Sequence, residues 1–247
     1  MSDGLLFYLA TGVSLLLIGL SKGGVGGMLG PLVTATMALV LPADQAIGLL
    51  LPLLIVGDAF AIAAHWRHWS GQHARRLVPA SILGVILAMV LLTDLPPLIL
   101  RRGIGLIILL FILFRWLEPR LRRDAKLVVR PWHGHLAGAS AGFTSSLAHV
   151  GGPPISIYLL VNELPPPVYA ATSALFFAVL NLIKLPFYIL AGLLMPDLLW
   201  RTLPLLPLLP LGVWLGKAFA HRMPRATFNR LILGLLLLSA ASLLLGA

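Results

Sequence analysis

Two glycine-rich segments interrupt apolar runs of the sequence and carry polar side chains suited to binding an anion. The first, SKGGVGGMLGP at residues 21–31, contains Lys22; the second, HVGGPP at residues 149–154, follows the hydroxyl run TSS and contains His149. Backbone N–H groups at the start of a helix are unpaired and carry partial positive charge, and glycine lets a ligand approach them closely. If a helix begins after each segment, the two helix starts would offer N–H groups, hydroxyls and cations to a negatively charged solute.

The predicted substrate-binding set combines these segments with an apolar run near residue 180. In that run, Asn181 and Lys184 add an amide and a second cation that could attract an anion. Each glycine or serine taken alone is explained equally well by close helix packing, but two matched clusters favour a binding site. The predicted substrate-binding residues are Lys22, Gly23, Gly24, Gly26, Gly27, Thr144, Ser145, Ser146, His149, Gly151, Gly152, Asn181 and Lys184.

Asp58 is an isolated acid inside the apolar segment LLIVGDAFAIAAHW. Charged residues in apolar segments are costly and usually functional, so we predict a proton-coupling or gating carboxylate. The alternative is a structural carboxylate that is hydrogen-bonded or paired with a lysine. Lys184 and Lys22 are both candidates for that pairing.

The composition indicates a membrane protein. Hydrophobic residues make up 59% of the 247 residues, charged residues make up 11%, and the mean hydropathy is +0.99. The apolar runs do not alternate with polar residues and are closer to about 20 residues than to about 10, so helices are favoured over barrel strands. We therefore expect an all-α polytopic membrane protein embedded in the lipid bilayer.

The net charge of +10 does not indicate nucleic-acid binding here, because basic residues that flank membrane helices follow the positive-inside rule. The sequence contains no cysteine, and therefore no disulfide and no thiolate metal site. His65, His68 and His73 have a spacing that resembles metal ligation, but they lie in a tryptophan-rich loop where anchoring at the membrane interface is the more frequent role. We predict no metal, no cofactor and no nucleic-acid partner.

The apolar elements divide into two similar halves. They lie at residues 5–20, 28–41, 46–66, 77–93, 98–117, 134–148, 153–161, 168–193, 199–220 and 226–245. The polar segment 118–133 separates a first repeat, residues 1–117, from a second, residues 134–247, and is predicted to be a basic cytoplasmic linker. In each half a broken or hairpin helix pair comes first, because its runs are shorter than a full span, and three transmembrane helices follow.

The two halves resemble each other at particular positions. Gly26-Gly27 and Gly151-Gly152 occupy corresponding places, and the segment with Asp58 aligns with the segment containing Asn181. Broken segments at corresponding positions are typical of secondary transporters built from repeats.

Basic residues give the two halves opposite orientations. The linker and the segments near residues 67–76 and 222–225 are basic and are predicted to face the cytoplasm. The resulting topology has two inverted repeats related by a pseudo-two-fold axis in the membrane plane. Three arginines fall on the predicted outer side and weigh against this orientation, although the linker has the densest basic run: Arg101, Arg102 and Arg201.

The chain resembles the sulfite exporter TauE/SafE family, also called the TSUP family. The resemblance lies in GLSKGGVGGMLGPLV, in GFTSSLAHVGGPPISIYLL and in the segments with Asp58 and Asn181, and it covers nearly the whole chain. It implies a multi-pass carrier of the bacterial inner membrane that moves sulfite or an organosulfonate such as sulfoacetate or isethionate. The first half has Lys22 and only GVGG where many relatives have a longer glycine string, so the resemblance does not fix the exact substrate. Because the direction of transport varies within the family, import and export are both open, and so is the formation of a homodimer.

A sulfonate is a tetrahedral anion with three acceptor oxygens, and converging N–H groups, hydroxyls and a lysine match it. An anion channel is one alternative, and coupling of anion flux to a proton gradient would exclude it. The other is an intramembrane hydrolase with Ser145 or Ser146 as nucleophile and His149 as base. The sequence has no GxSxG elbow and no third orienting group, so we predict a transporter and not an enzyme.

Overall fold

The computed structural model describes residues 2–25, 29–124, 130–220 and 225–245, and these parts are almost entirely helical. In chain order the elements are α1 (Ser2–Leu20), the π-helical turn η1 (Ser21–Val25), α2 (Gly30–Ala38), α3 (Ala43–Ala64), α4 (Gly71–Asp94), α5 (Pro97–Asp124), α6 (Pro131–Ala148), α7 (Gly152–Val161), α8 (Pro166–Leu190), α9 (Pro196–Thr202), the 3₁₀ turn η3 (Leu203–Leu205), α10 (Leu208–Ala220) and α11 (Arg225–Leu245). The predicted all-α class is confirmed for the described residues.

Several helices could cross a membrane. Within the described residues, four are long and apolar enough, and a fifth span results if the bent pair formed by α9 and α10 counts as one. The four are Gly4–Gly23, Ala43–Ala64, Gly71–Leu92 and Pro166–Leu190. Large apolar side chains on the outside of the bundle, such as Leu87 and Leu190, are exposed, as lipid-facing residues would be.

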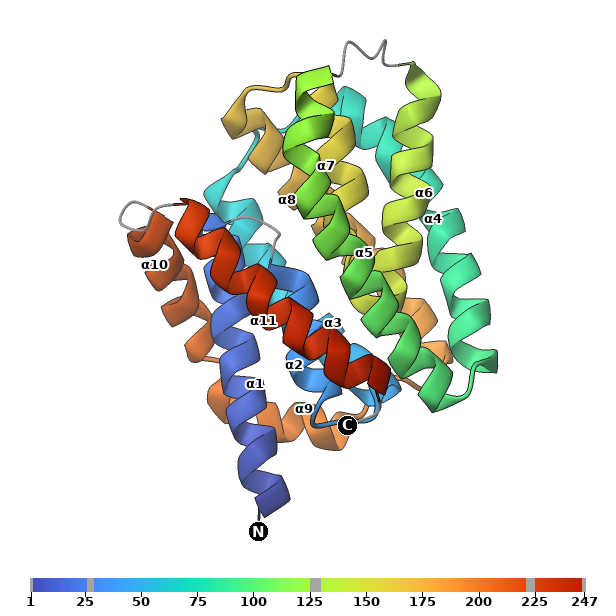
Figure 1. Cartoon of the computed structure of the whole chain (residues 1–247), viewed down its shortest axis with the longest axis vertical. Helices are drawn as coiled ribbons and strands as arrows, with labels where there is room; N and C mark the ends of the chain where they lie inside the picture. Colours follow the sequence, from blue (N-terminus) through green and yellow to red (C-terminus); the bar gives the residue numbers. More distant parts are fainter. Residues whose placement is uncertain (1, 26–28, 125–129, 221–224, 246–247) are drawn as a thin grey trace.

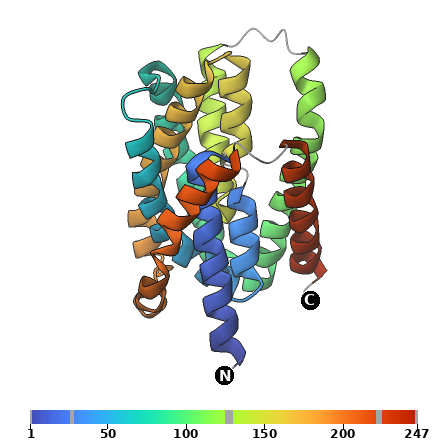
Figure 2. The same cartoon turned by 90° about the vertical axis from the view of Figure 1, so that its left-hand side faces the viewer.

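Two hairpins of broken helices meet near the middle of the molecule. Figure 1 shows α1 rising from the N-terminus at the bottom to the centre, from which α2 runs back down, and Figure 2 shows the same path from the side. At the opposite end, α6 descends from the top to the centre and α7 returns to the top. The predicted interruptions are present: α1 and η1 end at Val25, before α2 starts at Gly30, and α6 ends at Ala148, before α7 starts at Gly152.

Two predicted boundaries differ from the structure. The run at 199–220 was expected to be one element, but Pro204 and Pro207 divide it into α9, η3 and α10, with a bend of 57°. Proline lacks the N–H that continues the helix and clashes with the preceding turn. The linker was expected at 118–133, but α5 extends to Asp124 and α6 begins at Pro131, so helix occupies much of this segment.

Glycines bring pairs of helices into backbone contact. Gly19 and Gly23 face α10, whose Gly212 and Gly216 face α1 in return. A Cβ added to Gly23 would lie 2.2 Å from the carbonyl oxygen of Val213, which leaves no room for one. These reciprocal small-xxx-small patterns allow the close approach that stabilises helix pairs in lipid.

The same packing recurs between α4 and α6. A Cβ added to Gly138 would lie 2.1 Å from the carbonyl oxygen of Leu77, and one added to Gly142 would lie 2.2 Å from that of Ser81. In both pairs the first helix of a hairpin packs on a helix of the other half, so each interruption is held at the centre by residues far away in the sequence.

Substituting Gly138 by alanine is expected to lower stability, because the added methyl group would push α4 and α6 apart. Overpacking of this kind costs about 1–3 kcal/mol. Thermal unfolding of the purified protein in detergent measures the effect, and Gly103→Ala is the matched control, since a Cβ at Gly103 meets nothing within 4 Å. Equal unfolding temperatures for the two variants would contradict the role given to this contact.

Candidate functional site

A cavity of about 50 Å³ lies where the two hairpins meet. It is large enough for a few water molecules or one small anion. Gly30, the first residue of α2, and Gly152, the first residue of α7, both line it, so the positive ends of two helices face the same space. The full lining is Ile18, Ser21, Lys22, Gly30, Val33, Leu54, Ser145, His149, Gly152, Phe177 and Asn181.

The two hairpins contact each other directly beside this cavity. The hydroxyl of Thr34 on α2 donates a hydrogen bond of 2.7 Å to the carbonyl oxygen of Ala148, the last residue of α6. A Cβ on Gly30 would lie 2.9 Å from the carbonyl oxygen of His149. Only glycine therefore fits at the start of α2 without displacing the end of α6.

His149 ends α6 in a left-handed conformation with φ of 52°, where glycine is the usual residue. Its N–H donates to the carbonyl oxygen of Ser145 at 2.9 Å, which closes the helix. A side chain other than glycine at this position is uncommon, and here the imidazole lines the cavity. The conformation places a titratable ring at the interruption.

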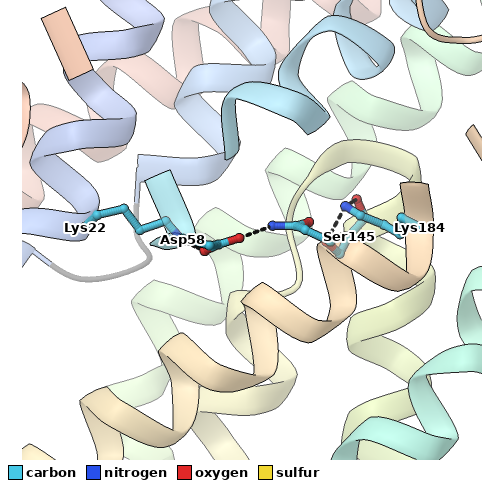
Figure 3. A network of polar contacts seen from close by, with 5 residues as sticks. Lys22, Asp58, Ser145 and Lys184 are labelled. Carbon is cyan, nitrogen blue, oxygen red and sulfur yellow. Dashed lines mark hydrogen bonds and ion pairs between the residues drawn. The ribbon is translucent and has the colours of Figure 1, made fainter. Parts of the chain in front are cut away.

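Asp58 is buried, and both of its carboxylate oxygens have partners. Oδ1 forms an ion pair with Nζ of Lys22, and Oδ2 accepts a hydrogen bond of 2.6 Å from the side-chain amide of Asn181 (Figure 3). Of the two lysines predicted as possible partners of Asp58, Lys22 is the one that forms the pair. This pair connects η1 to α3, and the amide connects α3 to α8.

Lys22 remains in contact with the cavity although it is paired. Its side chain is 15% exposed, it lines the cavity, and Nζ lies 5.9 Å from the centre of the Phe177 ring. An ammonium over an aromatic face is favourable, so Phe177 and Asp58 together fix the position of the charge.

Lys184 is fully buried and has a separate set of partners. Nζ lies 3.2 Å from both the carbonyl oxygen and the hydroxyl of Ser145, and 3.0 Å from Nδ1 of His149. In Figure 3 the Lys22–Asp58 pair and the Lys184–Ser145 contacts lie at the two ends of one row of side chains. Lys184 does not line the cavity, but Ser145 and His149 do.

The hydrogen bonds of His149 define its tautomer. Nε2 lies 3.0 Å from the carbonyl oxygen of Ile47, which can only accept, so Nε2 carries the proton. Nδ1 then accepts from Lys184. Because both ring nitrogens are engaged in this way, His149 does not act as the base for a serine nucleophile, which weighs against a hydrolase.

Two further predicted hydroxyls lie away from the cavity. Thr144 donates to the carbonyl oxygen of Ser140 in its own helix, at 2.9 Å. The hydroxyl of Ser146 is buried without a partner among the described residues, and its carbonyl oxygen accepts a hydrogen bond of 2.6 Å from Tyr188.

The predicted glycines have different surroundings. Gly152 lines the cavity, and Gly151 precedes α7 as its N-cap, where an added Cβ would lie 3.0 Å from the Ser145 side chain. Gly23 packs on α10, as the helix-packing alternative describes, and Gly24 lies in η1. The Gly26-Gly27 pair lies outside the described residues.

Sequence reasoning missed the apolar part of the lining. Ile18, Leu54 and Phe177 each lie four residues before a polar residue of the site, namely Lys22, Asp58 and Asn181. Residues four apart share one face of a helix, so helical spacing from the three polar residues would have identified them. The described residues contain no group of three or more histidines or acids that could hold a metal ion.

The family of the chain follows from its sequence profile. The profile of the sulfite exporter TauE/SafE family matches residues 11–243. The chain belongs to the sulfite exporter TauE/SafE family. No curated relative and no solved structure matches the chain. Membership of this transporter family, together with the apolar helices, makes the protein a multi-pass membrane transporter.

Replacing Lys22 by methionine should destabilise the protein, because it leaves the buried Asp58 carboxylate without its counter-charge. The loss is expected to be on the order of 2 kcal/mol, less than for a fully buried pair, because Lys22 is partly exposed. The double variant Lys22→Met with Asp58→Asn should recover much of that loss. Unfolding in detergent measures the coupling, and strictly additive effects of the two substitutions would contradict it.

Proposed function

We propose that this protein is a secondary transporter that moves a small sulfur-containing anion, sulfite or an organosulfonate such as sulfoacetate or isethionate, across the bacterial inner membrane in a process coupled to the proton gradient. The observation that carries the proposal is the cavity in which the starts of α2 and α7 converge with Lys22 and His149. A bilayer tolerates interrupted helices only where they are buried in protein or line a wet space, and transporters place substrate there.

The chemistry of the cavity fits a small oxyanion with a short carbon chain. Lys22, the Ser145 hydroxyl and the positive helix ends provide favourable partners for the oxygens of a sulfite or sulfonate group. Ile18, Leu54 and Phe177 provide an apolar wall against which carbon atoms could pack.

We further propose that residues 1–117 and 134–247 are inverted repeats, joined by the segment 118–133 on the cytoplasmic side. In this arrangement α1 corresponds to α6, α3 to α8, α4 to α10 and α5 to α11. The contact of α1 with α10 then has its counterpart in the contact of α6 with α4, and the contacts of α3 with α8 and of α5 with α11 are their own counterparts. Asp58 and Asn181, which align in the sequence, contact each other. Equivalent residues touch in this way when they lie near a two-fold axis, which supports the symmetry.

The charge distribution supports the proposed orientation. Arg67, Arg75 and Arg76 flank the α3–α4 connection, and Figure 1 places this connection at the same end of the molecule as the end of α5 and the start of α6. By the positive-inside rule this end faces the cytoplasm.

A homodimer is a further proposal, for which a cross-linking experiment in membranes is the direct test.

Asp58 is proposed as the gating or coupling carboxylate. Its contacts with Lys22 and Asn181 join η1, α3 and α8, so they connect parts of both halves beside the cavity. A change in the charge of this carboxylate would weaken both contacts and allow η1, α3 and α8 to move relative to one another.

Substrate uptake tests the proposed function. Liposomes containing the purified protein should accumulate labelled sulfite, isethionate or sulfoacetate, and Ser145→Ala should reduce this uptake about tenfold or more, since a hydrogen bond to a charged group contributes about 1.5–3 kcal/mol. Ser239→Ala is the control, because that hydroxyl bonds only to its own helix. Absence of uptake for the whole panel would overturn the proposal, and growth on the same sulfonates with this protein as sole carrier is the cellular counterpart.

Replacing Asp58 by asparagine should change the pH dependence of uptake, because the substitution fixes a neutral group next to Lys22. Uptake measured from about pH 5 to pH 9 provides the profile. Asp197→Asn serves as a control, since Asp197 is an exposed acid in the first turn of α9. If Asp58→Asn has the wild-type profile, Asp58 has no part in coupling. If anion flux through the wild-type protein does not depend on the proton gradient, the protein is a channel.

A further inference from the structure

Lys184 is a buried cation whose partners are all neutral. Its side chain is fully buried and forms hydrogen bonds to Ser145 and His149, whereas the only ion pair between side chains of the described residues joins Lys22 to Asp58. A buried ammonium without a counter-ion is costly, and the protein interior favours any process that removes the charge or brings an anion close.

The contacts of Lys184 can be kept whether or not Nζ carries its extra proton. The ammonium donates its three N–H groups to the Ser145 carbonyl, the Ser145 hydroxyl and Nδ1 of His149. The neutral amine keeps two of these donors, for the carbonyl and for Nδ1, and its lone pair accepts from the Ser145 hydroxyl once that hydroxyl turns. Since Nε2 of His149 donates to Ile47 in both states, the cluster gains or loses a proton without losing a hydrogen bond.

The other charged or titratable groups near Lys184 do not cancel its charge. Asp58 on α3 and Lys22 on η1 neutralise each other. His149, at the end of α6, is neutral when its Nδ1 accepts from Lys184. On α8 itself, the Tyr188 ring lies 5.8 Å from Nζ, and its hydroxyl donates to the carbonyl oxygen of Ser146. When Lys184 is protonated, it is therefore the group whose charge has no counter-ion as long as the cavity is empty.

Ser145 and His149 connect this cluster to the cavity. Each of them contacts Lys184 on one side and lines the cavity on the other. An anion in the cavity would therefore lie across these two side chains from Nζ, and it would supply the missing negative charge. Protonation of Lys184 and binding of the anion then favour each other, and this coupling acts equally in both directions.

We propose that Lys184 carries the coupling proton of this transporter, with Ser145 and His149 as the route between Nζ and the cavity. The neutral amine takes up one proton as an anion enters from one side, and it releases that proton as the anion leaves on the other. A monovalent anion thus crosses together with one proton and without net charge. The proposal rests on the proposed function, because it assumes a small anion in the cavity. It assigns the proton to Lys184, and Asp58 keeps the role of connecting η1, α3 and α8.

Proton movement in liposomes tests this assignment. With a pH-sensitive dye inside, an inward gradient of isethionate, whose charge is fixed, should acidify the lumen of wild-type liposomes, and a potassium diffusion potential should not change the rate. Lys184→Gln keeps two N–H donors but cannot take up the proton, so it should exchange isethionate while its proton movement falls at least about tenfold. Asp197→Asn, which changes an exposed acid outside the site, should still move protons with isethionate.

Tyr188→Phe is the matched control for the Lys184 substitution. It removes another fully buried polar group one turn further along α8, and proton movement should persist in it. Proton movement that is retained in Lys184→Gln would overturn the assignment, and its loss in Asp58→Asn would then place the proton on Asp58.

A measurement on the wild-type protein separates this proposal from the proposed function. Lysine labelled with ¹³C at Cε reports by NMR whether the neighbouring amine is protonated, and the Lys184 signal is the one absent from Lys184→Gln. In micelles titrated from about pH 5 to pH 10, this signal should change its protonation state, and added isethionate should favour the ammonium.

A Lys184 signal that stays ammonium throughout this range, with and without isethionate, overturns the proposal even if the protein transports sulfonates. If the signal changes with pH but none of the sulfonates and sulfite is transported, the proton site stands and the proposed substrate class fails.

Discussion

The last turn of α6 ends inside the protein, and its carbonyl groups must find donors there because lipid supplies none. Thr34 on α2 donates to Ala148, and Tyr188 on α8 donates to Ser146. Lys184 donates to the carbonyl one residue earlier. These bonds hold α2 and α8 against the interruption, and the cavity is the space that remains between them. The hydrogen bonds that satisfy the carbonyl groups at the end of α6 therefore also determine the geometry of the site.

Close glycine packing brings the two interruptions together. The first hairpin is anchored on α10 through Gly19 and Gly23, and the second is anchored on α4 through Gly138 and Gly142. Each hairpin thus packs on the other half of the chain, so each of the two pairs, α1 with α10 and α6 with α4, combines helices of both halves around the central site. Backbone contacts of this kind leave little freedom within a pair, so movement is expected between the pairs.

The charges at the site have distinct arrangements. Lys22 and Asp58 form a pair whose charges cancel, and it connects the first hairpin to α3. Lys184 is surrounded by neutral acceptors and lies behind Ser145 and His149. Two positive helix ends and Lys22 face the cavity, an arrangement suited to a small anion, in agreement with the sulfite exporter TauE/SafE family to which the chain belongs.

The sequence by itself determined the helices, their interruptions and the polar residues of the site. Hydropathy, glycine clusters and charges within apolar runs are local properties, so they located both hairpins and picked out Lys22, Asp58, Asn181 and Lys184. Only the tertiary structure decided that Asp58 pairs with Lys22 and not with Lys184. It also decided that Gly23 packs on α10. The physical reason is that these contacts join residues at least 36 positions apart, and helix packing, which no local pattern encodes, determines which of them meet.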